Sequence, residues 1–239
     1  MFLNPSLTAA LDRIAERAAD VRRAYTPGAI PQHDDVATPS RVSDFTLDPL
    51  CVVAPELSYF MARGEHGKIL YTRDGAFALR DGTLVDQDGH AILGRKTPSS
   101  ALGELHVDRV DGAIGDVAAA IESDGSLVYY RSVVDPRTAK RERQRIVVGQ
   151  LALARFPAGT RLEMADGSLS GAPAGVTPQV GVPGDGTFTP LIPMRRERSG
   201  ISVDESLARL KEAYLAFDAL QAAEMAKAHL GKTAMDLLK

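Results

Sequence analysis

Apolar residues near the start of the chain recur at the spacing of a helix that buries one stripe. The stripe consists of Leu7, Leu11, Ile14, Ala18 and Val21, and Tyr25 continues it. Steps of four and three residues are the a/d spacing of a heptad pattern. Charged residues, Asp20 among them, fill the opposite side. We predict an N-terminal assembly helix within residues 1–25, packed either on the protein's own β core or on a partner helix.

The end of the chain repeats the same spacing. Its stripe is Val203, Leu207, Leu210, Tyr214 and Phe217, and Leu220 follows at a step of three. These positions predict a C-terminal assembly helix over residues 200–239. At 1.5 Å per residue, such a helix would be about 54 Å long, which is more than a domain of this size needs to cover its core. We predict that the two helices pair with each other as a coiled coil.

The middle of the chain has the pattern of β structure. Short alternating apolar runs are separated by Asp-Gly, which suits type I′ turns because Gly tolerates positive φ. Seven such pairs begin at Asp74, Asp81, Asp88, Asp111, Asp124, Asp166 and Asp185. One tight hairpin is expected across Asp74-Gly75, between residues 68–73 and 76–80. The fold class is therefore predicted as α+β, with a mainly antiparallel β domain at 51–195 and a proline-rich linker at 26–50.

Composition excludes several classes of function. The 239 residues carry a formal charge of −3 with a pI of about 6.0, which argues against nucleic-acid binding. The single cysteine, Cys51, allows neither an internal disulfide nor a multi-cysteine zinc site. No apolar run reaches the length of a membrane span, so insertion into a lipid bilayer is not expected. The first 25 residues do not have the pattern of a signal peptide.

The sequence contains no recognisable catalytic or metal-binding motif. The five histidines are scattered, and neither a Gly-x-Ser-x-Gly elbow nor a phosphate loop occurs. Asp81, Asp86, Asp88 and Asp124 fit turns better than the spacing of an EF-hand. A basic run at residues 137–145 is expected to be a solvated hairpin tip or a contact with an acidic neighbouring subunit. We predict no enzymatic activity, no metal and no cofactor.

Four segments, in order along the chain, resemble the small axial rod proteins of the bacterial flagellar rod and hook family. The most specific is the turn motif Tyr71, Thr72, Arg73, Asp74 and Gly75, which lies in 69–79 and is followed by strand-and-turn matches at 82–86 and 88–94. The others are 121–125, 148–156 and 200–205. Two segments depart from the family: the asparagine-rich segment is missing near residues 25–32, and the usual Gln-Arg-Ala-Tyr segment is missing from the last helix.

The resemblance implies a structural subunit of the flagellar basal-body rod that polymerises through its terminal helices. Its partners would be copies of itself, other rod or hook subunits and the flagellar export apparatus. Its place would be the periplasmic rod, reached without a cleaved leader. The altered segment near residue 25 leaves an alternative open. In that alternative, a divergent paralogue keeps the β body and binds an envelope protein or a chaperone without polymerising.

Overall fold

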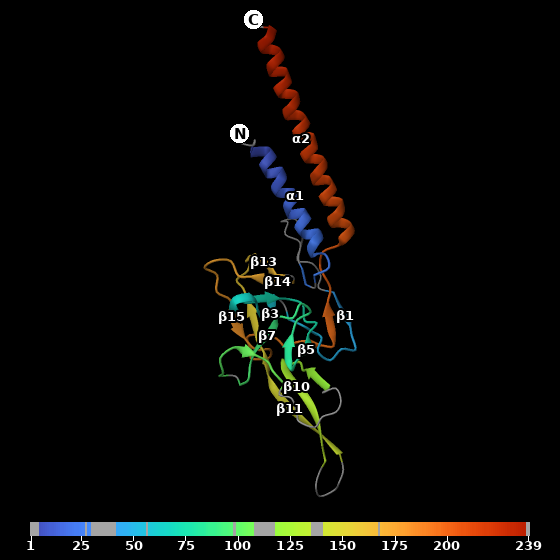
Figure 1. The fold of residues 1–239 in the computed structure, drawn as a ribbon, viewed down its shortest axis with the longest axis vertical. Coiled ribbons are helices and arrows are strands. Elements are labelled where there is room, and N and C mark those ends of the chain that lie inside the picture. Colours follow the sequence, from blue (N-terminus) through green and yellow to red (C-terminus); the bar gives the residue numbers. More distant parts are fainter. Residues whose placement is uncertain are drawn as a thin grey trace. The chain divides into compact units, whose positions relative to one another are not determined.

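The computed structural model describes residues 5–26, 28–29, 42–55, 57–97, 99–107, 118–134, 141–166 and 168–237. The chain divides into two compact units. The helical unit consists of Met1–Ser40 together with Ser199–Lys239, and the β unit is Arg41–Arg198. Over the described residues, the molecule has two α-helices and mostly antiparallel sheets, which confirms the predicted α+β class (Figure 1).

The helical unit contains α1 (Pro5–Arg23) and α2 (Val203–Leu237), which lie side by side (Figure 1). Local sequence explains where they begin and end. Arg22 and Arg23 occupy the last turn of α1. Asp204 and Glu205 occupy the first turn of α2. Basic residues at a C-terminus and acidic residues at an N-terminus both interact favourably with the helix dipole. The Ser202 hydroxyl accepts a bond from the Glu205 amide at 3.4 Å, which caps α2.

The β unit is built around one large antiparallel sheet. Its longest path has the order β13-β14-β4-β3-β7-β11-β10-β9, and the remaining strands pair at its sides. The thirteen strands are β3 (Ser58–Arg63), β4 (Ile69–Thr72), β5 (Ala78–Arg80), β6 (Thr83–Val85), β7 (Ala91–Arg95), β8 (Gly103–Glu104), β9 (Ala118–Ile121), β10 (Ser126–Val134), β11 (Arg141–Leu151), β12 (Leu153–Arg155), β13 (Glu163–Asp166), β14 (Leu169–Gly171) and β15 (Gln179–Gly181). A 3₁₀ turn, Glu65–Gly67, joins β3 to β4.

Two short antiparallel pairs complete the β unit. β1 (Ser43–Phe45) pairs with β17 (Arg195–Glu197), and β2 (Val52–Val53) pairs with β16 (Ile192–Pro193). β1 lies inside the segment predicted as a linker, so the start of the β unit moves from residue 51 to about 42. β1 is recognised only through its pairing with β17. Its three residues are too few to show an alternation of apolar and polar positions in a proline-rich segment.

The interior of the β unit combines aliphatic side chains with several buried aromatic rings. Phe60, Ile92, Leu127 and Leu153 are inaccessible to solvent and belong to one hydrophobic cluster. A second cluster contains Tyr71 and Phe156, whose rings meet edge to face with centroids 4.9 Å apart. Since hydrophobic burial supplies most of the favourable free energy of folding, these clusters hold the connecting segments in fixed positions.

The Asp-Gly pairs occupy several different kinds of connection. Asp81 and Gly82 have φ values of 49° and 82° and stand between β5 and β6, which pair from Arg80↔Thr83 outward. The hairpin predicted across Asp74-Gly75 is wrong. β4, just before this pair, bonds to β3 and β14, and β5 bonds to β6 instead. Asp111-Gly112 and Gly167 lie outside the described residues.

Candidate functional site

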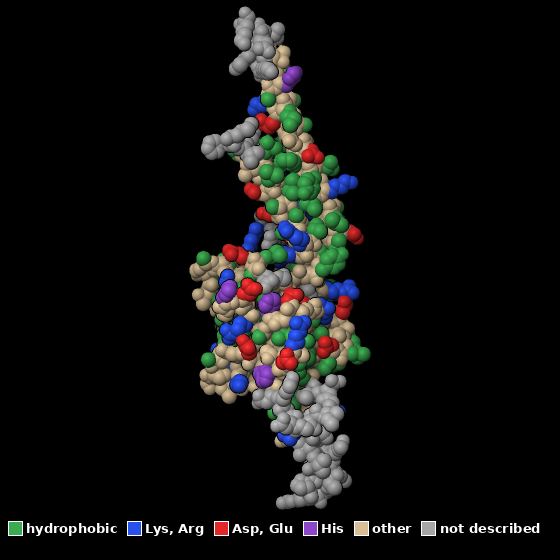
Figure 2. All heavy atoms as spheres, viewed as in Figure 1, with side chains coloured by type: hydrophobic (Ala, Val, Ile, Leu, Met, Phe, Trp, Pro, Cys, Tyr) green, Lys and Arg blue, Asp and Glu red, His purple; other side chains and the backbone are tan. Residues whose placement is uncertain are grey.

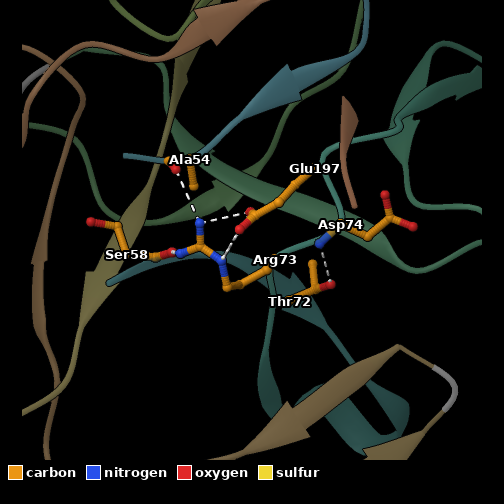
Figure 3. Close-up of polar contacts among 6 residues, drawn as sticks. All are labelled: Ala54, Ser58, Thr72, Arg73, Asp74 and Glu197. Atoms are coloured by element: carbon orange, nitrogen blue, oxygen red, sulfur yellow. Dashed lines mark hydrogen bonds and ion pairs between the residues drawn. The ribbon is translucent and has the colours of Figure 1, made fainter. Parts of the chain in front are cut away.

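The turn motif that resembles the rod family lies at the end of β4, and its arginine is buried. Arg73 is 4% exposed. Its Nη2 donates to Glu197 at 2.7 Å and to the Ala54 carbonyl at 3.1 Å. Its Nε also donates to Glu197, and its Nη1 donates to the Ser58 carbonyl (Figure 3). A planar guanidinium with several bonds of this kind fixes four segments relative to one another.

The rest of the motif forms a tight junction rather than a two-residue hairpin turn. The Asp74 amide donates to Thr72 Oγ1 at 3.0 Å, and the Asp74 carboxylate accepts from the Ala76 amide at 3.0 Å. A Cβ atom on Gly75 would lie 1.8 Å from the Val52 carbonyl oxygen, so only glycine fits. Burial raises the pKa of Asp74, and the Ala76 bond and Arg196 partly offset that rise.

Glu197 is the structural partner of Arg73, and no sequence pattern singles it out. It is 4% exposed, although it stands among three arginines at 195–198. Its pairing with Arg73 could not be anticipated, since no periodic pattern links positions so far apart in the sequence. The motif residues therefore tie β4 to β17.

In the helical unit, α1 and α2 run in opposite directions. Near one end of the pair, Ala24 and Ala29 pack with Ile201 and Val203. Farther along, Ala10 and Arg17 of α1 line the same hollow as Leu220 and Arg209 of α2. The N-terminal part of α1 therefore lies beside the middle of α2, and the C-terminal end of α1 lies beside the start of α2. Most of α1 thus packs against the first half of α2.

The buried face of α1 is shifted from the predicted stripe. Ala10, Ile14, Asp20 and Ala24 are buried, whereas Leu11 is 40% exposed. The expectation that Asp20 lies on the solvated side is wrong, since it is 2% exposed. The other stripe residues of α1 are half-buried: Leu7, Ala18 and Val21. Alanines at the contact allow a close approach of the helices, which a heptad count of large side chains does not anticipate.

On α2, the predicted stripe divides into two groups. Val203, Leu210 and Phe217 are half-buried. Leu207, Tyr214 and Leu220 are exposed, at 48%, 50% and 38%. Ser206, which the stripe omits, is buried at the contact. The helix thus presents one apolar face to α1 and leaves other large apolar side chains in solvent.

α2 carries further exposed apolar residues, two of which lie in its second half. Leu215 is 61% exposed, Met225 63% and Leu230 69%. α2 has 35 residues and α1 has 19, so at 1.5 Å per residue they are about 52 and 28 Å long. Hydrophobic side chains gather along this unit in Figure 2. Several large apolar side chains exposed along one helix are typical of an interaction surface.

A hollow of about 370 Å³ lies between the two helices. Arg13 and Arg17 of α1 and Arg209 of α2 line it, together with Glu212. Its remaining walls are small or apolar: Ala10, Ala213, Ala216 and Leu220. Heptad spacing puts Arg13 and Arg17 on the charged side of α1 and cannot reveal this hollow, because the hollow depends on how the helices are rotated against each other.

One group in the β unit has ligand atoms close enough for a metal ion. Asp86, Asp88 and His90 each offer one such atom, all within 4.8 Å of one another. Both Asp86 oxygens are already engaged, because one accepts the Gly89 and His90 amides and the other lies 3.0 Å from His90 Nδ1. The group is thereby explained as the side chains that close this turn.

The basic run predicted as a hairpin tip falls largely at the end of the β10–β11 ribbon. β10 and β11 pair out to Val134↔Arg141, whereas β9 accompanies β10 only as far as Tyr130. Arg143 and Arg145 are exposed, and Arg145 Nη2 bonds to Glu122 at 2.5 Å. Arg137 and Lys140 lie outside the described residues.

Neither helix, over the residues described, has a stretch long and apolar enough to cross a membrane. Comparison of the chain with models of known protein families finds no match, and no curated protein matches it significantly. The functional interpretation therefore depends on the geometry of the two units and on the sequence resemblance to axial rod proteins.

Proposed function

We propose that this protein is a structural subunit of the bacterial flagellar basal-body rod. It polymerises through its terminal helices and has no catalytic role, metal or cofactor. Its partners are copies of itself and other rod or hook subunits, after delivery by the flagellar export apparatus to the periplasmic rod. In this proposal α1 and α2 pair as an antiparallel coiled coil, and Asp-Gly pairs other than Asp74-Gly75 close hairpins in the β body.

The exposed apolar face of α2 is the observation that carries the proposal. A helix gains most of its stability in a protein from packing, yet the second half of α2 exposes Met225 and Leu230 by 63% and 69%. Burying one such side chain is worth about 1.5–3 kcal/mol. A neighbouring subunit that covers these residues would stabilise both copies. The four segments that resemble rod proteins support the same interpretation independently.

Analytical ultracentrifugation tests self-assembly with matched variants. The wild-type chain should form concentration-dependent oligomers, and Met225→Lys with Leu230→Lys should remain monomeric. The free energy of unfolding of the monomer should change by less than about 0.5 kcal/mol, because both side chains are exposed before assembly. Asp204→Lys, an exposed position in the first turn of α2 that adds the same two positive charges, is the control and should assemble normally.

A cellular experiment tests the biological role. Deletion of the gene from its own bacterium should abolish swimming, and the wild-type gene should restore it whereas the double-lysine variant should not. A wild-type chain that stays monomeric at all concentrations, in a deletion strain that still swims, would contradict the proposal. That pair of results would favour the alternative, a paralogue that binds an envelope protein or a chaperone.

A further inference from the structure

The hollow between α1 and α2 carries more positive than negative charge. Three arginines and one glutamate line it, which leaves a formal charge of about +2. Arg209 bonds to Glu205 at 2.5 Å, so part of its charge is already balanced. Arg17 Nη1 is buried and has no hydrogen-bond partner among the described residues, even though Glu212 lines the same hollow. A buried donor without an acceptor is unfavourable, and together with the net positive charge it makes the site favour an added anion.

The shape of the hollow suits a carboxylate carried on a helix. At about 370 Å³ it has room for a side chain beyond the arginine heads. Ala10, Ala213 and Ala216 form low walls, so another helix can approach the groove closely. A carboxylate entering there would accept charge-assisted bonds from Arg17 and its neighbours, and guanidinium groups bind carboxylates well through two parallel bonds.

The same chain carries a helix face of the required character. Asp218 is exposed, and it lies nine positions after Arg209. At about 100° per residue, that places it about 180° around α2 from the hollow. Tyr214 and Leu215 precede it by about one turn and are 50% and 61% exposed, and Met225 follows at 63%. An acidic side chain is thus flanked by exposed apolar ones.

We propose that the arginine hollow receives Asp218 from α2 of a second copy of this chain. The inference rests on the proposed function and names the contact through which copies join. Because the face that carries Asp218 and the arginine hollow lie on opposite sides of α2, the contact is head-to-tail. Such contacts generate rings or helical filaments rather than closed two-fold dimers. The arginines set register and orientation, and the flanking apolar residues supply buried area.

A charge-swap experiment on the full chain tests this contact by sedimentation equilibrium. Asp218→Arg and Arg17→Glu should each weaken association at least about tenfold, because each places like charges together. The chain carrying both changes should return to within about threefold of wild type, since the opposite charges meet again across the interface. Asp204→Arg makes the same change in net charge near the start of α2 and should leave association unaltered.

Each outcome bears on the proposal. Single variants that associate like wild type, or a folded double variant no better than the weaker single, overturn it. If Arg17→Glu fails to fold by circular dichroism, Arg13→Glu replaces it, because Arg13 lines the same hollow with an exposed side chain. Citrate stabilises folded proteins in general, so the comparison is with the folded Arg17→Glu chain. Citrate that raises the melting temperature of a wild-type monomer but not that of Arg17→Glu would identify a free anion as the occupant and overturn the assignment to a second copy.

Failure of this inference can be told apart from failure of the proposed function. If all charge variants associate like wild type while Met225→Lys with Leu230→Lys does not associate, the assembly role stands and the arginine contact is wrong. If wild type itself never associates, both are wrong. Association through the arginines should also weaken as salt rises from 0.05 to 0.5 M, because screening shortens the reach of charges on a solvent-open groove.

Discussion

Arg73 and Glu197 are 124 residues apart in the chain, yet they form a buried ion pair with Nη2 and Oε2 at 2.7 Å. Both side chains are only 3% exposed. The pair connects the end of β4 to β17, and the Ala54 and Ser58 carbonyls take the remaining guanidinium bonds. A buried ion pair adds little to the free energy of unfolding compared with apolar residues of the same size. Removing only one of its partners, however, is strongly destabilising, because the other charge stays buried without compensation.

We therefore expect Arg73→Met or Glu197→Gln to lower the free energy of unfolding of the β unit by about 3–5 kcal/mol, because either change leaves an uncompensated buried group. Chemical denaturation followed by circular dichroism measures this. Removal of both partners should cost less than the sum of the two single changes. The exposed pair Arg198–Asp44 is the control, and its loss should cost less than about 1 kcal/mol. Equal effects at the two pairs would contradict the structural role of Arg73.

A second prediction concerns backbone packing at Gly75. Gly75→Ala places a methyl group 1.8 Å from the Val52 carbonyl oxygen, which is backbone and cannot move aside. We expect the β unit to unfold several kcal/mol more easily, or not to fold at all. Gly103→Ala is the matched control, since no heavy atom lies within 4 Å of its added carbon. That variant should be nearly neutral in the same denaturation assay.

The sequence was most informative where structure depends on neighbouring residues. The helix predicted over 200–239 is α2, and the β domain predicted for 51–195 contains the strands β3 to β15. It was least informative about contacts between distant segments. Asp74-Gly75 has the composition of a turn, yet its glycine is required by the approach of Val52. A dipeptide cannot reveal which of these two causes applies.

The candidate assembly surface was predictable in outline only. Heptad spacing indicated apolar stripes on both helices, but not which members would be covered. Leu11 is exposed and Ala10 is buried, because the rotation of α1 is decided by the shape of α2. Heptad spacing could not predict the arginine hollow either, because its lining comes from both helices. Arg17 and Arg209 come together only when the antiparallel alignment is known.

A third prediction uses the raised pKa of Asp74. Burial favours the neutral form of Asp74, so the folded state binds this proton more tightly than the unfolded chain does. In the unfolded chain the carboxyl has its ordinary pKa of 3.8. Below that pH both states are protonated and Asp74 has no effect. As pH rises from 3.8 through the folded pKa, the charged form penalises folding. Wild type should therefore lose stability relative to Asp74→Asn over this interval, as measured by urea unfolding at successive pH values.

Asp185 supplies a control of opposite sign. Burial tends to raise its pKa, but bonds from the Phe188, Thr187 and Val182 amides outweigh this and lower the pKa below 3.8. Its stabilising effect is complete above 3.8 and is lost as pH falls through the folded pKa. Asp185→Asn should therefore differ most from wild type at neutral pH and approach it in acid. The same trend for both variants would contradict these assignments.

A fourth prediction concerns the thiol of Cys51. Burial, helped by the nearby Asp48 carboxylate, raises its pKa to about 11. At pH 8 roughly one thiol in a thousand would be ionised, and the thiolate is the reactive form. A disulfide reagent should therefore label the native protein very slowly and the urea-unfolded protein at the rate of an ordinary cysteine. Rapid native labelling would mean that the Cys51 side chain is open to solvent.

The last prediction tests the pairing of α1 with α2 inside one chain. Antiparallel alignment brings Ala10 near Leu220 and Arg17 near Arg209, so the middle of α1 should face the segment around Ala213. In a chain with Cys51→Ser, the pair Ile14→Cys and Ala213→Cys should oxidise to an intramolecular disulfide.

Leu215→Cys in place of Ala213→Cys is the matched control for this crosslink. Its side chain is 61% exposed and lies two residues farther along α2, about 200° around the helix. It should therefore give no intramolecular disulfide with Ile14→Cys. Non-reducing electrophoresis across a dilution series separates the two origins of a crosslink, because an intramolecular bond forms at the same rate at every protein concentration. If Ile14→Cys and Ala213→Cys crosslinked only between chains, the helices would pair across subunits, and the antiparallel seam would be an assembly contact rather than part of the monomer.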